Sequence, residues 1–320
     1  MRFLADERMY TETDACLRFL RELSGGPAQL APGTRERYHL YWRGPFSRKQ
    51  AFTVKSFLAT QDLDESDLWL WLDREAAGPG YDENQYLLPL RPFLELRRFD
   101  PEIEVRDTPI DGSPDLYRDV SPTVRSDLFR HVVLYKHGGV YVDIDMMFLR
   151  DLRILRSDPR FAGELCYRWS AHLPYANSAV LALRKGSDAA LALLHRCAEM
   201  HTCRPKIVLD FDANRDLDLF VVPCVAFDPL WPHHDGQDTY PDAPFRQFGE
   251  FFRGFGWRFP KPSIRSHREF FPGAFTYHWH NCWDAPEHES SYFGLFDAVF
   301  DRVLRERLGV EPASPGGAGP

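Results

Sequence analysis

The sequence lacks any apolar run long enough to cross a membrane and any stripe of basic residues. A membrane-spanning helix needs about 18 to 20 apolar residues in succession, and no stretch of the 320 residues provides them. The net charge is −8 and the arginines are interleaved with acids, which argues against nucleic acid as a ligand because phosphates need neighbouring cations. In residues 1–20 charges interrupt the apolar positions, so this stretch does not have the pattern of a signal peptide.

Cysteines are few and dispersed. None of the six lies in a C-x-x-C pair, which argues against a zinc site and is typical of reduced thiols. They are Cys16, Cys166, Cys197, Cys203, Cys224 and Cys282. We therefore expect a cytoplasmic protein, free or peripheral to the membrane, with a Golgi or secreted enzyme that lacks its anchor as the alternative.

Strand-like and helix-like segments alternate along the chain, and 44% of its residues are hydrophobic, enough for a large core. This alternation predicts an α/β fold with a mostly parallel sheet. Such sheets place their sites beyond the carboxyl ends of strands, here near Asp73, Asp143 and Asp145. The predicted strands are 38–42, 68–73, 102–107, 139–145, 161–168 and 178–184, and the predicted helices are 1–24, 47–60, 122–137, 187–200 and a last one that ends near Leu308.

The positions of Gly- and Pro-rich breaks and of changes in composition predict one main domain with a short N-terminal helix and a short C-terminal tail. Residues 1–27 form an N-terminal helix closed by Ser24-Gly25-Gly26-Pro27, and 37–310 form the domain. Within it, residues 228–263 are irregular and dense in Pro, Gly, His and aromatics, which indicates an acceptor loop or lid, or else a structural insertion. Residues 311–320 have the composition of a disordered tail.

Two aspartates follow an apolar run in YKHGGVYVDIDMMF, residues 135–148. Strand side chains alternate between faces at ~3.3 Å per residue, so the carboxylates of Asp143 and Asp145 should emerge ~6.6 Å apart on one side. Two close carboxylates repel each other unless a cation lies between them, and Mg²⁺ and Mn²⁺ prefer such oxygen ligands. The alternation divides the run into an apolar face with Val140, Val142 and Ile144, and a polar face with Tyr141, Asp143 and Asp145.

The helix before this run is expected to present polar residues to the same place. Ser121 is a suitable N-cap, and Gly138 suits the end of the helix. Asp127 and Arg130 are three residues apart and therefore share one face. Because Gly138 and Gly139 turn the chain directly into the aspartate strand, this polar face can overlook the carboxylates.

The block SDLFRHVVLYKHGGVYVDID, residues 126–145, resembles the signature of glycosyltransferases with the DXD sugar-binding region. These are of the family-32 type, which includes fungal α-mannosyltransferases and α-galactosyltransferases and is related to the catalytic domains of the large glucosylating toxins. The pattern S-D-x-x-R, then L, then G-G-x-Y-x-D-x-D is matched at Ser126, Asp127, Arg130, Leu134, Gly138, Gly139, Tyr141, Asp143 and Asp145.

Two further segments resemble parts of that family. YHLYWRG, residues 38–44, is similar to its first strand, which implies that Trp42 stacks on the nucleobase of the donor, although a tryptophan of the core would look the same. NSAVLALRKG, residues 177–186, is similar to a segment whose asparagine contacts sugar or acceptor, which makes Asn177 a candidate.

The segment YHWHNCW, residues 277–283, resembles the C-terminal H-x-x-x-S-W segment of the family. The resemblance implies that His278 contacts the metal, with His280 as the alternative, and that Trp283 lies at the nucleotide. Cys282 stands where the family has a serine, which puts a role for a hydroxyl group there in doubt.

The resemblance implies a GT-A type, Rossmann-like fold and transfer of a hexose from a UDP- or GDP-linked donor to a glycan or small acceptor, with retention and with Mn²⁺ or Mg²⁺ bound. Asp145 would be a direct ligand, and Asp143 would bind the ion, a water or the ribose. Asp127 and Arg130 would hold sugar hydroxyls, and Tyr141 a phosphate oxygen. A role in polysaccharide biosynthesis is the expected setting.

Three other classes of protein compete with this interpretation. A phosphatase of the haloacid-dehalogenase type also ends a strand in D-x-D, but Met147 stands where Thr or Val usually follows. A glycoside hydrolase uses paired carboxylates that normally come from different strands. A carbohydrate-binding GT-A protein without catalytic turnover is the third alternative, and Cys282 leaves room for it.

Overall fold

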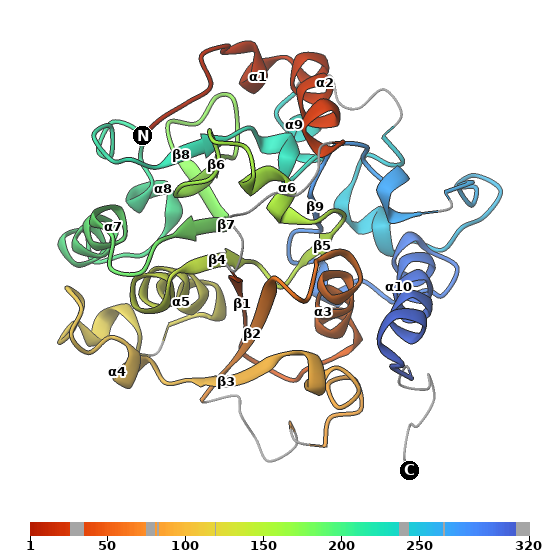
Figure 1. Ribbon diagram of the computed structural model, residues 1–320, viewed down its shortest axis with the longest axis horizontal. Helices are drawn as coiled ribbons and strands as arrows, with labels where there is room; N and C mark the ends of the chain where they lie inside the picture. Colours follow the sequence, from red (N-terminus) through yellow and green to blue (C-terminus); the bar gives the residue numbers. More distant parts are fainter. Residues whose placement is uncertain are drawn as a thin grey trace.

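A mixed sheet runs through the centre of the protein (Figure 1). The computed structural model describes residues 1–25, 35–74, 81, 83–118, 120–236, 243–264 and 266–311. Within these residues the strands follow one another across the sheet in the order β3 (Glu95–Phe99), β2 (Ser66–Asp73), β1 (Glu36–Trp42), β4 (Gly139–Val142), β7 (Ala176–Leu183), β6 (Leu165–Arg168) and β8 (Phe220–Val222).

The directions of the strands determine which strand ends lie together at one edge of the sheet. Strands β3, β2, β1 and β4 are parallel, whereas β7 is antiparallel to β4 and to β6. The carboxyl ends of β1 and β4 therefore lie at the same edge as the beginning of β7 and the end of β6. A second, two-stranded antiparallel sheet pairs β5 (Met146–Phe148) with β9 (Thr276–His278).

Helices cover both faces of the sheet. One face, with Leu40 and Leu70, packs against α3 and α10, which lie side by side. The other face, with Tyr41 and Trp71, packs against α5 and α7. The helices are α1 (Arg8–Thr11), α2 (Thr13–Ser24), α3 (Arg48–Thr60), α4 (Pro101–Glu104), α5 (Pro122–His137), α6 (Leu152–Arg156), α7 (Asp188–Glu199), α8 (Pro205–Val208), α9 (Trp231–His234) and α10 (Tyr292–Leu308).

Helix α5 has the bounds that its sequence predicted. The Ser121 hydroxyl accepts a hydrogen bond from the Val124 amide at 3.4 Å, and Gly138 ends the helix with a φ of 66°. Gly139 follows with a φ of 109°, and a Cβ there would collide with the carbonyl oxygen of Arg37 in β1. Only glycine allows helix α5 to turn so closely into β4.

The strand predicted at 102–107 is wrong. Asp100 caps a short helix, α4, through a 3.1 Å hydrogen bond from the Glu102 amide, and Pro101 occupies its first position. The strand of this region is instead β3, whose sequence ELRRF was not recognised. Among the described residues it pairs only with β2, at the edge of the sheet, and edge strands tolerate such polar sequences.

Several boundaries differ from the sequence prediction. Helix 1–24 is split into α1 and α2, and Arg2 forms a bridge to Phe220 in β8. The predicted strand at 161–168 begins only at Leu165, and β4 ends at Val142, before the two aspartates. The tail beyond residue 311 lies outside the described residues, and the division into domains stays a prediction.

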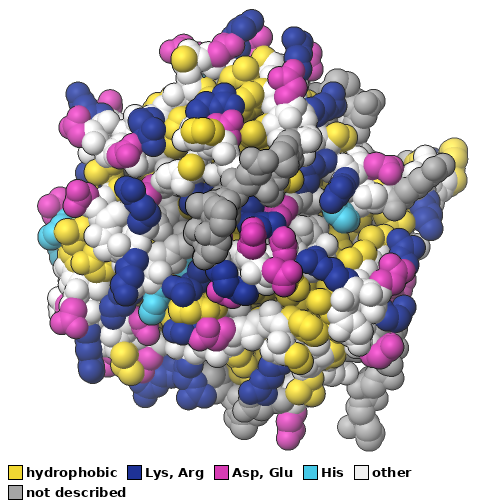
Figure 2. All heavy atoms as spheres, in the orientation of Figure 1, with side chains coloured by type: hydrophobic (Ala, Val, Ile, Leu, Met, Phe, Trp, Pro, Cys, Tyr) yellow, Lys and Arg dark blue, Asp and Glu magenta, His cyan; other side chains and the backbone are white. Residues whose placement is uncertain are grey.

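The irregular segment 228–263 contains α9 and a 3₁₀ turn over Phe248–Phe252, and its residues 237–242 lie outside the described part. No helix in the described ranges has the length and apolarity needed to span a bilayer. Figure 2 shows acidic and basic side chains interspersed over one face of the molecule, in keeping with the mixed charge pattern of the sequence.

Candidate functional site

A cavity of about 720 Å³ opens at the sheet edge where β1 and β4 end. Ten residues that the sequence singled out for the site line it, whereas Asp73 does not: it is buried and pairs with Tyr41 and Arg125. The ten are Trp42, Asp127, Arg130, Tyr141, Asp143, Asp145, Asn177, His278, His280 and Trp283. The structure thus brings together residues that are up to 241 positions apart in the chain, from Trp42 to Trp283.

The two aspartates lie in a turn between two strands. The Asp143 amide still donates to the Ala179 carbonyl oxygen at 2.8 Å, so the first aspartate continues the line of β4. The chain then leaves the large sheet and enters β5, where Met146 pairs with His278 of β9. Although the predicted continuous strand is wrong here, both carboxylates still face one cavity.

Arg130 holds the first aspartate. Its Nη2 lies 3.1 Å from Asp143 Oδ1 and 3.2 Å from Asp127 Oδ1, and its Nη1 donates to the Ser178 hydroxyl at 2.9 Å. The Tyr141 hydroxyl also donates to Asp143 Oδ1. Burial alone would lower the pKa of Arg130, but the surrounding acids raise it, so the guanidinium stays charged. This network fixes the direction in which Asp143 points.

Asp127 carries a strongly perturbed carboxyl group. Burial raises its pKa from 3.8 to about 7, against the opposing effect of Arg130. The folded chain therefore binds this proton more tightly than the unfolded chain does. The stability of the fold then decreases as the pH rises from 3.8 through about 7.

Replacing Asp127 with Asn should stabilise the protein at pH 8 but not at pH 4. Asparagine has no charge to desolvate, so the melting temperature of the variant should exceed that of the parent by a few degrees above the pKa of the carboxyl, since ~1 kcal/mol shifts the midpoint by about 2–4 °C. Calorimetry at both pH values measures this difference. If the melting temperatures of the variant and the parent differ by the same amount at pH 4 and at pH 8, the burial-raised pKa of Asp127 is contradicted.

Asp145 is almost completely buried and pairs with His278. Its Oδ1 lies 3.2 Å from His278 Nε2, and its Oδ2 accepts a hydrogen bond from the Asn281 amide at 2.8 Å. Burial alone would raise the pKa of Asp145, but the imidazole outweighs it and lowers the pKa below its ordinary value. Burial likewise opposes the charge on His278, but Asp145 raises the pKa of His278 to about 9.

The donor set fits a divalent cation. One ligand atom each from Asp143, Asp145 and His278 can be chosen so that all lie within 4.8 Å of one another. Two carboxylates and one imidazole suit Mn²⁺, and the carboxylates also suit Mg²⁺. His278, rather than its alternative His280, belongs to this group.

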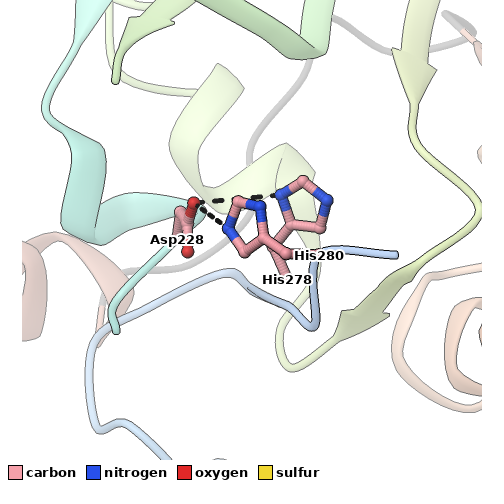
Figure 3. Close-up of side chains that lie close together, drawn as sticks. All are labelled: Asp228, His278 and His280. Atoms are coloured by element: carbon pink, nitrogen blue, oxygen red, sulfur yellow. Dashed lines mark hydrogen bonds and ion pairs between the residues drawn. The ribbon is translucent and has the colours of Figure 1, made fainter. Parts of the chain in front are cut away.

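Asp228 is a buried carboxylate that the sequence analysis missed. Its Oδ2 lies 2.7 Å from His280 Nε2 and 3.8 Å from His278 Nδ1, and the two imidazole rings stack at 3.8 Å (Figure 3). Asp228 has no exposed surface, and its Oδ1 has no partner among the described residues. The sequence gives little indication of this role, because Asp228 belongs to a single Asp-Pro pair at the start of an irregular loop and lies in no helix or strand pattern.

Two tryptophans close one end of the cavity. The rings of Trp42 and Trp283 lie 4.7 Å apart at 50°, and Trp42 Nε1 donates to the Pro45 carbonyl oxygen at 2.9 Å. Lys49, which the sequence analysis also missed, donates to the carbonyl oxygens of Cys282 at 2.8 Å and Trp283 at 2.6 Å. A charged amine thereby fixes the loop that carries Trp283.

Residues 106–162 match the protein family described as glycosyltransferase sugar-binding region containing DXD motif. The chain carries a glycosyltransferase sugar-binding region. This match confirms the resemblance found in residues 126–145 and, with it, the assignment of the protein as a glycosyltransferase. It also decides against the phosphatase and glycoside hydrolase alternatives. No curated protein matches the chain.

Solved structures of glycosyltransferases are similar to this protein at low sequence identity. The WbbM bifunctional glycosyltransferase has a TM-score of 0.50 and 10% identity over 87% of this chain, which spans about half (52%) of that protein. GlyE of Streptococcus pneumoniae has a TM-score of 0.48 and 12% identity over 89% of this chain and 66% of its own. Mouse xyloside xylosyltransferase 1 has a TM-score of 0.46 and 14% identity over 80% of this chain and 100% of its own. The predicted GT-A type fold is confirmed.

Proposed function

We propose that this glycosyltransferase transfers a hexose from a UDP- or GDP-linked donor to a glycan or other acceptor, with a divalent cation bound and with retention at the anomeric carbon. The observation that carries the proposal is the convergence of Asp143, Asp145 and His278 in one cavity with Trp42. A cytoplasmic location and a role in polysaccharide biosynthesis belong to the same proposal and rest on the sequence alone.

The charges of the cavity support a cation-dependent donor site. Asp143 and Asp145 would repel the diphosphate of a nucleotide sugar if nothing neutralised them. A divalent cation held by these carboxylates and His278 would stabilise the negative charge that develops on the departing diphosphate. The volume of about 720 Å³ lies within the range of about 300–1,000 Å³ that is usual for ligand pockets.

The remaining side chains bind and orient the donor. Trp42 would stack on the nucleobase, with Trp283 packed beside it at 4.7 Å, and Tyr141 would donate to a phosphate oxygen. Arg130 and Asp127 would hold hydroxyl groups of the hexose, because a guanidinium and a carboxylate make strong hydrogen bonds to them.

Retention is part of the proposal because no lining carboxylate stands alone to act as a base. Among the described residues of the cavity, Asp127 and Asp143 pair with Arg130, and Asp145 pairs with His278. The acceptor oxygen would bond to the anomeric carbon while the bond from that carbon to the diphosphate oxygen breaks. The hydroxyl proton would pass to the departing diphosphate on the same face.

Thermal unfolding in the presence of nucleotide sugars tests the proposed donor. A ligand that binds only the folded state raises the melting temperature. We expect UDP- or GDP-hexoses to raise it in the presence of Mn²⁺ and to have little effect in EDTA. Equal stabilisation in Mn²⁺ and in EDTA would contradict a cation-dependent donor site, and the absence of any effect from either nucleotide would contradict the donor class.

Asp228 is expected to strengthen cation binding by fixing His278. Asp228 Oδ2 lies 3.8 Å from His278 Nδ1, beyond hydrogen-bond distance, but its charge favours a proton on that nitrogen and so leaves the Nε2 lone pair free for an ion. Removing a carboxylate that orients a ligand histidine typically weakens metal binding by about 10- to 100-fold. Replacing Asp228 with Asn should therefore raise the dissociation constant for Mn²⁺ by about that factor, as measured by calorimetry on the folded variant.

The control for this experiment is Asp216→Asn, which removes an exposed carboxylate elsewhere on the surface. It should leave the affinity for Mn²⁺ unchanged. An Asp228→Asn protein that unfolds normally and binds Mn²⁺ as tightly as the parent would show that His278 is oriented without Asp228.

A further inference from the structure

The cavity extends beyond the space that the proposed donor would occupy. Trp42 stands at the end of β1, Asp143 at the end of β4, Tyr175 directly before β7, and Trp169 directly after β6. In the sheet order β1-β4-β7-β6 these positions follow one another along one edge. Neighbouring strands are ~4.8 Å apart, so Trp42 and Trp169 lie on strands ~14 Å apart. The cation site lies between these two ends.

The end beside β6 and β7 is basic. Arg204 and Lys206 line the cavity there, and both side chains are exposed. In the described part of the chain neither forms a hydrogen bond or ion pair with a carboxylate, and Arg204 acts on Asp127 only through space. Two exposed cations at the rim of a cavity favour the approach of an anionic group, although the whole chain carries a charge of −8.

Among the described residues, the carboxylates of the cavity form their ion pairs with side chains other than these two cations. Asp127 and Asp143 are already paired with Arg130, and Asp145 with His278. The negative charge of a donor diphosphate would be balanced by the divalent cation of the proposed site. The side chains of Arg204 and Lys206 are therefore available to an anionic group of a bound ligand.

The same end has an aromatic wall. The ring of Trp169 lies 4.7 Å from that of Trp231 at 35° and 6.3 Å from that of Tyr175 at 66°. Packing against Trp231 holds Trp169 in one orientation, and Trp169 and Tyr175 are both only partly buried. Rigid aromatic faces of this kind offer the apolar contact area that one face of a sugar ring requires.

We propose that this end is an acceptor subsite for an anionic carbohydrate, in which Trp169 and Tyr175 contact the sugar ring and Arg204 and Lys206 bind its carboxylate or phosphate group. The inference rests on the proposed donor site, because a nucleotide at Trp42 and a diphosphate at the cation leave this end for the acceptor. Arginine and lysine both bind such groups through charge-assisted hydrogen bonds.

Direct binding measurements on the full chain, loaded with Mn²⁺ and UDP or GDP, test the inference. The probes are methyl β-glucuronide, glucose 6-phosphate and the uncharged methyl β-glucoside. We expect the parent protein to bind one of the charged probes at least about tenfold more tightly than the glucoside. The two charged probes distinguish a carboxylate from a phosphate as the preferred group.

The double variant Arg204→Ala/Lys206→Ala should lose about 10- to 100-fold in affinity for the charged probe, the range expected for hydrogen bonds to charged groups. Its affinity for the nucleotide sugar with Mn²⁺ should not change. The control variant Lys185→Ala/Arg302→Ala removes the same charge from exposed positions outside the cavity and should retain both affinities.

Three outcomes would overturn the inference. Equal binding of the charged and uncharged probes by the parent would show that the acceptor need not be anionic, while the donor site would stand. A loss of nucleotide-sugar affinity in the double variant would assign Arg204 and Lys206 to the donor. A parent protein that binds no nucleotide sugar in Mn²⁺ would remove the proposed function and the acceptor subsite with it.

Discussion

Asp145→Ala should abolish the cation-dependent release of nucleotide from a nucleotide sugar. In the proposed site this carboxylate is a direct ligand of the ion, and a bound ion contributes several kcal/mol to stabilising the leaving group. A loss of ~4 kcal/mol corresponds to a rate about 10³-fold lower. The measurement is the rate of UDP or GDP release from the donor sugar in Mn²⁺, with and without acceptor.

This experiment needs two further variants, because removing Asp145 also leaves the Asn281 amide and the Nε2 atom of His278 without a partner. Such buried unsatisfied groups cost about 1–3 kcal/mol each, so the alanine protein will melt at a lower temperature. Asp145→Asn can still accept the hydrogen bond from Asn281 and should keep the fold while losing activity. Asp212→Ala, at an exposed position, should retain full activity. Unchanged turnover in both Asp145 variants would refute the metal assignment.

Gly139→Ala should be among the most destabilising single substitutions in the chain. The added Cβ would collide with the Arg37 carbonyl oxygen on the adjacent strand, and alanine rarely adopts the φ of 109° found here. The Arg37 oxygen belongs to the backbone and the Cβ is held rigidly by the backbone of residue 139, so β1 and β4 would have to separate. We expect a loss of about 2–4 kcal/mol, measured as the free energy of unfolding in denaturant.

Gly112→Ala is the matched control for this substitution. Gly112 also has a positive φ, of 80°, but no atom lies within 4 Å of the position that its Cβ would take. The control therefore contains the conformational cost of alanine without the collision. Equal destabilisation by the two substitutions would mean that the close approach of β4 to Arg37 is not required.

The sequence predicted the local structure around the candidate site well. Helix α5 has the predicted bounds because Ser121, Pro122 and Gly138 are strong signals that act within the helix itself. The paired glycines and the aspartates after them form one contiguous block, so their approximate arrangement follows from short-range geometry alone. The gathering of Trp42 and Trp283 at this block was available only from the family resemblance.

The parts that failed depend on distant partners. The chain leaves the large sheet after Val142 because β5 pairs with β9, and the register of Met146 with His278 is what brings the imidazole to Asp145. No local pattern indicates a pairing between segments more than 120 residues apart. The role of Asp228 is hidden for the same reason, since its partners His278 and His280 lie about 50 positions further along the chain.

The most direct test of the account is a crystal structure with Mn²⁺ and UDP or GDP, recorded near the absorption edge of manganese. The account predicts an anomalous peak coordinated by Asp143, Asp145 and His278, with the diphosphate on its open side and the nucleobase stacked on Trp42. Crystals that contain the nucleotide but show no manganese at these three residues would contradict it.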